Sequence, residues 1–224
     1  MATEGSLHNI IFRKITRPKL IPFLKKYRTD KKTLDIGGGY GKYKEYFPNS
    51  VIIDKQKGEA VDIVGDAHNL PFGDNSFEVV LCLHVLDDCE DPYRVAGEMK
   101  RVLMPDGFMI LCVPFIYPIN DGPDDYWRFT PYTLKKLFGD MEEIEISPVL
   151  KQMETIALIF QRLSYQGRGT KAKRFLFGFL AWAINALNLD RWIDQSGYPT
   201  IGRKPGTEID NIVTALYFAV FKKK

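Results

Sequence analysis

The chain has 224 residues, of which 45% are hydrophobic and 26% charged, so it can form one sizeable globular domain with or without an appended element. Its formal net charge of +3 is too small to indicate nucleic acid binding, and nucleic acid is not expected as a partner. Three cysteines without metal-ligand spacing indicate reduced thiols, a cytoplasmic protein and no bound metal.

Strand-like apolar runs alternate with helix-like segments from Thr33 onward, which is the pattern of a parallel sheet with crossover helices. The sequence predicts seven strands, over residues 33–36, 50–53, 60–64, 78–83, 108–113, 142–147 and 212–221. It predicts helices over residues 18–27, 40–47, 92–104 and 131–138. Asp91 and Thr130 each precede a proline and are expected to cap the last two of these helices.

Four segments follow from this order. They are a basic N-terminal helical segment (1–32), a core (33–150), a helical insertion or lid (151–210) and a last strand (211–224). No long apolar stretch near the N-terminus predicts a signal peptide or membrane anchor. Within the insertion, basic residues precede an aromatic-rich helix. For this helix, a buried lid or a dimer contact is favoured, and contact of residues 168–189 with an anionic membrane surface is the alternative. The sequence does not predict the oligomeric state.

The stretch LDIGGGYGKY places a glycine-rich turn directly behind the first strand. Asp35, Gly37, Gly39 and Gly41 fit the spacing Asp-x-Gly-x-Gly-x-Gly, in which backbone approaches a ligand closely. Lys42 stands where the dinucleotide fingerprint has its last glycine, which argues against a pyrophosphate and a dinucleotide oxidoreductase. An acidic residue before the glycines suits a ligand that carries an ammonium group.

Two more carboxylates follow at the ends of the next strands. Asp54 is suited to accept hydrogen bonds from ribose hydroxyls, and Asp66 with Ala67 can face an adenine edge. Because parallel strands end at one edge of the sheet, these groups indicate a single nucleoside ligand.

With these groups in this order, the chain resembles the class I S-adenosylmethionine-dependent methyltransferases, most of all the type 11 group. The segments LDIGGGYG, VIIDK, GDAHNLPFGDNSFEVVLCLHVLDDCEDP and RVLMPDGFMILCVP carry the resemblance. It implies a Rossmann-like α/β fold with a mostly parallel seven-stranded sheet, helices on both faces and an antiparallel last strand. It further implies that S-adenosyl-L-methionine is held by Asp35, Gly37, Gly39, Gly41, Asp54, Lys55, Asp66, Ala67, Cys82 and His84.

Two places are candidates for the chemistry. His84 follows the fourth strand and is expected to act as a proton acceptor or substrate contact, with a structural role as the alternative. The stretch GPDDYWRFTP resembles a PxDYWRFT loop of methyltransferases associated with glycan and cell-envelope biosynthesis, in which relatives often carry His at the place of Asn120. The expected roles are catalysis for Asp125 and substrate binding for Asn120, Asp124, Tyr126, Trp127 and Arg128. In the alternative, Arg128 pairs with Asp124 or Asp125 while Tyr126 and Trp127 fill the core.

The predicted function is methyl transfer by in-line displacement to a small-molecule, sugar or lipid-linked acceptor. The alternative is a non-catalytic scaffold or regulator that binds S-adenosylmethionine. This alternative stays open because the chain departs at two positions from the family that it resembles. Asp88 stands where relatives often carry His, and Asn120 is the second departure.

Overall fold

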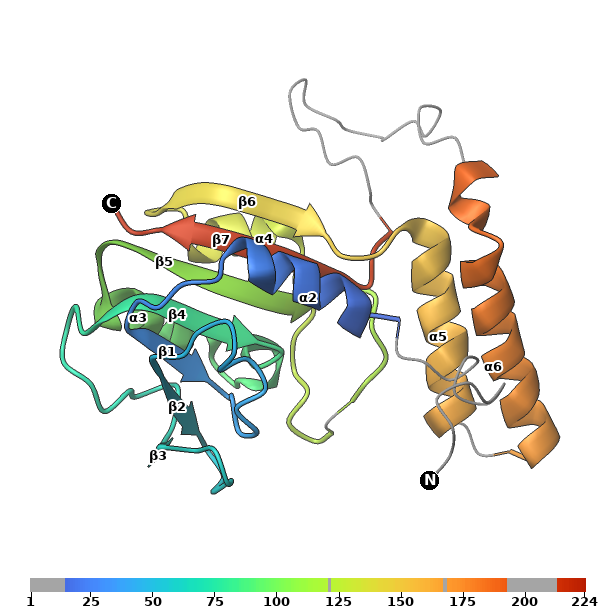
Figure 1. The fold of residues 1–224 in the computed structure, drawn as a ribbon, viewed down its shortest axis with the longest axis horizontal. Coiled ribbons are helices and arrows are strands. Elements are labelled where there is room, and N and C mark those ends of the chain that lie inside the picture. Colours follow the sequence, from blue (N-terminus) through green and yellow to red (C-terminus); the bar gives the residue numbers. More distant parts are fainter. Residues whose placement is uncertain (1–14, 121, 167–168, 193–212) are drawn as a thin grey trace. The chain divides into compact units, whose positions relative to one another are not determined.

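The computed structural model describes residues 15–120, 122–166, 169–192 and 213–224 (Figure 1). It divides into a sheet unit, residues 21–147 and 216–224, and a helical unit, residues 1–20 and 148–215. Residues 1–14, 121, 167–168 and 193–212 lie outside the described residues, so each of the four expected segments is described only in part. The segment boundaries expected from the sequence stay predictions.

The sheet unit contains a seven-stranded sheet with the order β3-β2-β1-β4-β5-β7-β6. The strands are β1 (Thr33–Ile36), β2 (Ser50–Asp54), β3 (Ile63–Val64), β4 (Phe77–Leu83), β5 (Leu103–Pro114), β6 (Glu142–Pro148) and β7 (Leu216–Lys222). The first five strands pair in parallel, whereas β7 runs antiparallel to β5. The Rossmann-like, mostly parallel sheet with an antiparallel last strand is thereby confirmed.

The order of the strands reverses at β1, which lies between β2 and β4. Asp35 is opposite Ile52 of β2 on one side and Leu81 of β4 on the other. In open α/β sheets, ligands bind beyond the carboxyl ends of the strands at such a reversal. The topology therefore directs attention to the segments that follow β1, β2 and β4.

Helices cover both faces of the sheet (Figure 1). Helix α3 (Pro92–Val102) begins where Asp91 Oδ1 accepts hydrogen bonds from the N–H groups of Tyr93 and Arg94, as the sequence predicts. Helix α4 (Pro131–Leu137) is capped by Thr130 in the same way, and both helices contribute to one buried core. On the opposite face, Phe23 of α2 (Arg17–Lys26) stacks on Phe218 of β7, with ring centroids 4.1 Å apart.

Several elements differ from their predicted bounds. Strand β7 is Leu216–Lys222 where residues 212–221 were predicted, and α3 ends at Val102 rather than at residue 104. The helix expected over residues 40–47 is a series of turns, since Gly41 adopts a φ of +60° and the turn closes with a Gly41 N–H bond to the Gly38 carbonyl. Strand β3 begins only at Ile63, because Asp62 receives the Ile52 N–H on its carboxylate. Strand β5 begins at residue 103 rather than 108, with an irregularity in its pairing to β4.

The helical unit consists of α5 (Gln152–Gln166), α6 (Lys171–Ala186) and the short 3₁₀ helix η2 (Leu189–Trp192). Phe160 of α5 stacks on Phe177 of α6, with centroids 6.1 Å apart. Arg174 Nε donates to the Ser164 carbonyl over 2.8 Å, which joins the same two helices. Over the described residues, every helix is too short or too polar to cross a membrane.

Candidate functional site

The turn after β1 is made of glycines because neighbouring groups fill the space that side chains would need. Gly37 and Gly41 have φ values of +72° and +60°, in the left-handed region that L-residues rarely adopt. A Cβ at Gly37 would lie 2.2 Å from Val85 Cγ2, and one at Gly39 would lie 2.9 Å from Asp54 Oδ2. The turn therefore brings bare backbone against the ends of β2 and β4.

Asp35 lies beside this turn, with only 3% of its surface exposed. A Cβ on Gly38 would meet Asp35 Oδ2 at 2.4 Å, so the carboxylate packs directly against the turn. Burial, and after it the negative charge of Asp54, raises the pKa of Asp35 to about 7. The predicted contact of Asp35 with the cofactor stays a prediction, and the position of the side chain favours support of the turn.

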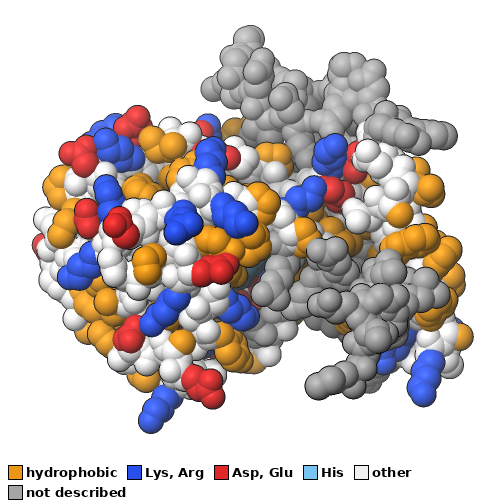
Figure 2. All heavy atoms as spheres, viewed as in Figure 1, with side chains coloured by type: hydrophobic (Ala, Val, Ile, Leu, Met, Phe, Trp, Pro, Cys, Tyr) orange, Lys and Arg blue, Asp and Glu red, His pale blue; other side chains and the backbone are white. Residues whose placement is uncertain are grey.

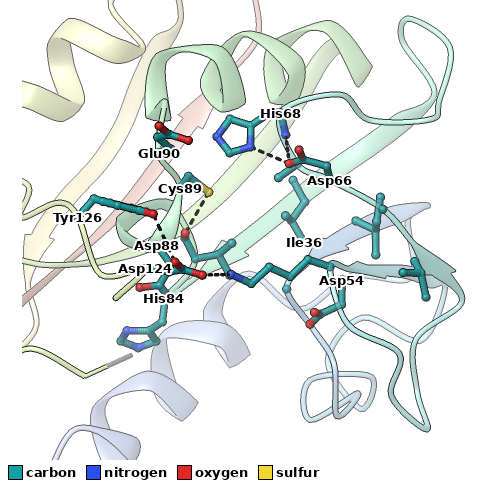
Figure 3. Close-up of a pocket in the computed structure, with 17 residues that line it drawn as sticks. Ile36, Asp54, Asp66, His68, His84, Asp88, Cys89, Glu90, Asp124 and Tyr126 are labelled. Carbon is teal, nitrogen blue, oxygen red and sulfur yellow. Dashed lines mark hydrogen bonds and ion pairs between the residues drawn. The ribbon is translucent and has the colours of Figure 1, made fainter. Parts of the chain in front are cut away.

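A cavity of about 520 Å³ opens at the carboxyl ends of β1, β2, β3 and β4 (Figure 3). Its volume is within the range of small-molecule and cofactor sites. It is lined by Ile36, Gly37, Ile53, Asp54, Lys55, Val64, Gly65, Asp66, Ala67, His68, His84, Val85, Asp88, Cys89, Glu90, Asp124 and Tyr126.

Half of the predicted site residues line this cavity, and they come from both the cofactor and the substrate group. These are Gly37, Asp54, Lys55, Asp66, Ala67, His84, Asp124 and Tyr126. The others are not among its lining residues, namely Asp35, Gly39, Gly41, Cys82, Asn120, Asp125, Trp127 and Arg128.

Two carboxylates form one side of the cavity. Asp54 Oδ1 accepts the Gln56 N–H over 3.0 Å. Asp66 Oδ1 accepts the His68 N–H over 2.9 Å and lies 2.6 Å from His68 Nδ1. The backbone hydrogen bond from His68 and then the one from its side chain lower the pKa of Asp66, so this carboxylate stays ionised at neutral pH.

His84 lies at the end of β4, with its side chain exposed at the cavity. It has a φ of +59°, and its N–H donates to the Cys112 carbonyl over 2.9 Å. His84 Nε2 lies 3.3 Å from Cys112 Sγ, and burial raises the pKa of that thiol, which therefore stays protonated. Cys82 is fully buried in β4. An exposed imidazole at the wall is suited to take up a proton from a ligand.

The segment after β5 is fastened to the segment after β4. The N–H groups of Tyr126 and Trp127 both donate to the Asp87 carbonyl, over 2.9 and 3.1 Å. Trp127 Nε1 also donates to the Glu90 carbonyl over 3.3 Å. Because Tyr126 and Trp127 are 50% and 38% exposed, they do not fill the core, whereas Phe129 is fully buried.

Asp125 and Arg128 form the ion pair that was one of the sequence alternatives. Arg128 binds Asp125 through both terminal nitrogens, with 2.9 Å between Nη2 and Oδ2, and its Nε donates to the Tyr117 carbonyl. The Asn120 N–H donates to the same carboxylate. The Arg128 hydrogen bonds lower the pKa of Asp125, which makes it a weak proton acceptor. This geometry favours positioning of the loop over catalysis for Asp125.

We expect Asp125→Asn to destabilise the protein by about 2–3 kcal/mol, because it leaves the partly buried Arg128 without its carboxylate. Asp124→Asn is the matched control, since its Lys55 pair is largely exposed and contributes about 0–1 kcal/mol. Urea unfolding of both variants gives the two free energies. Amide hydrogen exchange at Tyr126 and Trp127 should accelerate only in Asp125→Asn. Equal stabilities for the two variants would contradict the positioning role.

Asp87 is buried beside this loop, and its hydrogen bonds do not fully replace the water that its carboxyl group loses. It is 9% exposed, and its Oδ1 has no hydrogen-bond partner in the part of the chain that the structure describes. Burial, followed by the charge of Asp88, raises the pKa of Asp87 to about 7. Carboxylate oxygens of Asp87, Asp88 and Asp125 lie within 4.8 Å of one another, and Arg128 already supplies a cation to this group.

One ion pair joins the two walls of the cavity. Lys55 Nζ, after β2, lies 3.0 Å from Asp124 Oδ2, and Asp124 Oδ1 accepts a hydrogen bond from the Tyr126 hydroxyl over 3.3 Å (Figure 3). A residue predicted for the cofactor and one predicted for the substrate therefore bind each other. Because both side chains are about half exposed, the pair can open at little cost.

Several lining residues were not predicted from the sequence. His68 is the clearest, and its spacing of two residues from Asp66 was an available signal, because it allows the turn in which one carboxylate binds the backbone two residues on. Val85, Cys89 and Glu90 carry no such signal, since they reach the cavity only through the packing of the segment after β4.

Residues 34–111 match a protein family described as "Methyltransferase domain". Among curated proteins, the chain is 26% identical over 137 residues to the demethylmenaquinone methyltransferase of Paenarthrobacter aurescens, which covers 54% of this chain and 52% of that protein. It is 36% identical over 107 residues to the enzyme of the same name from Staphylococcus epidermidis, covering 44% of each. The chain thus spans about half the length of these relatives.

Solved structures share the fold. A Burkholderia thailandensis 1,6-didemethyltoxoflavin-N1-methyltransferase, solved with bound 1,6-didemethyltoxoflavin and S-adenosylhomocysteine, superposes with a TM-score of 0.55 at 13% identity. The superposition covers 97% of this chain and 82% of that one.

Proposed function

We propose that the protein is a class I methyltransferase that transfers the methyl group of S-adenosylmethionine to a small-molecule acceptor, because residues 34–111 match a methyltransferase domain and the strand order places a cavity at the carboxyl ends of the parallel strands. The observation that carries the proposal is a cavity in which Asp54 and Asp66 lie on one side and His84, Asp124 and Tyr126 on the other (Figure 3). The demethylmenaquinone methyltransferases support a small-molecule, quinone-type acceptor. A sugar or a lipid-linked molecule is the alternative acceptor that the PxDYWRFT-like loop suggests.

The residues at the cavity fit the cofactor. The glycine turn brings backbone without a side chain to the cavity at Gly37, so a ligand can approach it closely. Asp54 offers an acceptor for ribose hydroxyls, and the ionised Asp66 offers one for the adenine amino group. The donor set and the volume of about 520 Å³ therefore match a nucleoside that carries an amino acid.

When bound, S-adenosylmethionine supplies an electrophilic methyl group together with its leaving group, so the protein mainly holds the reactants in line. Ile36 and Val85 line the cavity with apolar side chains, which favours exclusion of water from its wall. His84 takes up the proton when the acceptor is a hydroxyl or a protonated amine. Tyr126, half exposed on the same side of the cavity as His84, offers an aromatic face to a planar acceptor.

We expect Asp54→Ala to weaken the binding of S-adenosylhomocysteine by at least about tenfold, because it removes a charged hydrogen-bond acceptor. Isothermal titration calorimetry measures this change directly. Asp140→Ala is the matched control, since that carboxylate is exposed and pairs with Lys100 outside the cavity. An unchanged affinity in Asp54→Ala would contradict the proposed binding of the ribose hydroxyls by Asp54.

Turnover requires a separate test. The protein should transfer a labelled methyl group from the cofactor to at least one member of a panel of demethylated quinols, sugars and lipid-linked sugars. Binding of the cofactor without any methylated product across the panel would favour the scaffold or regulator that the sequence left open.

A further inference from the structure

Helix α6 carries a stripe of exposed apolar side chains. Phe175, Leu176, Phe179 and Trp182 are 46%, 53%, 44% and 38% exposed. Positions 175, 179 and 182 follow the helical repeat of four and seven residues, so their side chains lie on one face. Four large apolar groups exposed together on one helix form a patch of the kind that marks an interaction surface.

The contact between α6 and α5 does not use this stripe. Within α6, the buried residues are the small Gly178 and Ala181, which allow the two helices to approach closely. Phe177 and Arg174 make the ring stacking and the hydrogen bond to α5. Pairing of the two helices therefore leaves the stripe available.

The charge of α6 is entirely basic. Lys171, Lys173 and Arg174 occupy its first turn, and residues 171–186 contain no acidic side chain. Cations at a helix N-terminus oppose the helix dipole, so these residues do not stabilise α6 itself. In Figure 2, Lys and Arg side chains (blue) lie at one end of this helix and hydrophobic side chains (orange) continue along it.

We propose that α6 lies in the surface of an anionic phospholipid membrane, with the aromatic stripe in the interface and the basic first turn against the phosphates. A basic end followed by Phe, Leu and Trp on one face is the composition of interfacial helices. At 16 residues, α6 is shorter than the roughly 20 that a spanning helix needs, so it lies along the surface. This proposal is independent of the methyl-transfer function.

The test is flotation of the full-length protein with vesicles of phosphatidylcholine alone or with 30 mol% phosphatidylglycerol, on the order of physiological anionic content. The wild type should float only with the anionic vesicles and less at high salt. The variants Leu176→Ser/Phe179→Ser and Lys171→Gln/Lys173→Gln should each lower the bound fraction at least about fivefold. Tyr132→Ser and Lys135→Gln/Lys136→Gln are matched controls on α4 and should bind as the wild type does.

Three results would overturn the proposal. The first is a wild type that binds no anionic vesicles, and the second is binding that neither α6 variant reduces. The third is a dimer, detected by light scattering, that Leu176→Ser/Phe179→Ser dissociates while vesicles remain unbound, which would make a second copy of the chain the partner. An unchanged helical circular dichroism spectrum in each variant shows that its helices are folded, and this readout does not depend on the proposed function.

Discussion

Gly37→Ala is expected to lower the free energy of unfolding by about 2–5 kcal/mol and the affinity for S-adenosylhomocysteine by at least about tenfold. The φ of +72° disfavours any L-residue, and the new Cβ would overlap Val85 Cγ2 at 2.2 Å. Relief of this overlap displaces either the glycine turn or Val85, and both line the cavity. Urea unfolding and calorimetry measure the two effects.

The chain offers a matched control and a partial rescue for this variant. Gly97 lies inside α3, and a Cβ there would meet nothing within 4 Å, so Gly97→Ala should stabilise the protein by about 0.5–1 kcal/mol. Adding Val85→Ala to Gly37→Ala should restore the stability that is lost through the overlap with the Val85 side chain. It should not restore the stability that is lost because alanine disfavours a positive φ. A Gly37→Ala protein as stable as the wild type would contradict the steric account of the turn.

The second large effect concerns the dependence of the free energy of unfolding on pH. The pKa of Asp87 is about 7 in the folded protein, above its ordinary value of 3.8. Between about pH 4 and pH 7 the folded state therefore holds a proton that the unfolded state has lost, and the free energy of unfolding falls as the pH rises. A shift of about three pKa units corresponds to about 4 kcal/mol as an upper bound. Asp35 contributes in the same direction, because its pKa is also raised to about 7.

Asp87→Asn should remove the Asp87 share of this dependence. Between pH 5 and pH 8, its unfolding free energy should decline by about 2–3 kcal/mol less than that of the wild type. Asp106→Asn serves as the control, because Lys222 lowers the pKa of that exposed carboxyl and its titration lies below this range. Identical pH profiles for Asp87→Asn and the wild type would show that Asp87 is not the group responsible.

Local signals predicted the elements whose ends are set by neighbouring residues. Asp91 followed by Pro92 predicted the start of α3, and the continuous apolar run predicted β4 as a central strand. The helix expected over residues 40–47 failed because its apolar spacing was helical while the left-handed Gly41 favoured turns. Strand β3 was too long in the prediction because a side chain, Asp62, replaced a backbone partner in the ladder.

The two walls of the site differ in how far the sequence predicted them. Asp54 and Asp66 lie directly at strand ends, so their place at the cavity followed from topology alone. The loop after β5 depends on contacts such as those from Tyr126 and Trp127 to the Asp87 carbonyl, about 40 residues apart in the chain, which no local pattern predicts. The choice between Asp124 and Asp125 as partner of Arg128 likewise required the folded loop.

The single carbonyl of Asp87 that accepts both loop N–H groups has a thermodynamic consequence. It fastens the segment after β4 to the loop after β5, which together form one side of the cavity, and the Lys55–Asp124 pair joins this side to the end of β2. We therefore expect a ligand that shifts one side to change the affinity for a second ligand at the other, and linkage requires the effect to be equal in both directions. The stability of a complex with both ligands would then contain this coupling energy in addition to the two separate affinities.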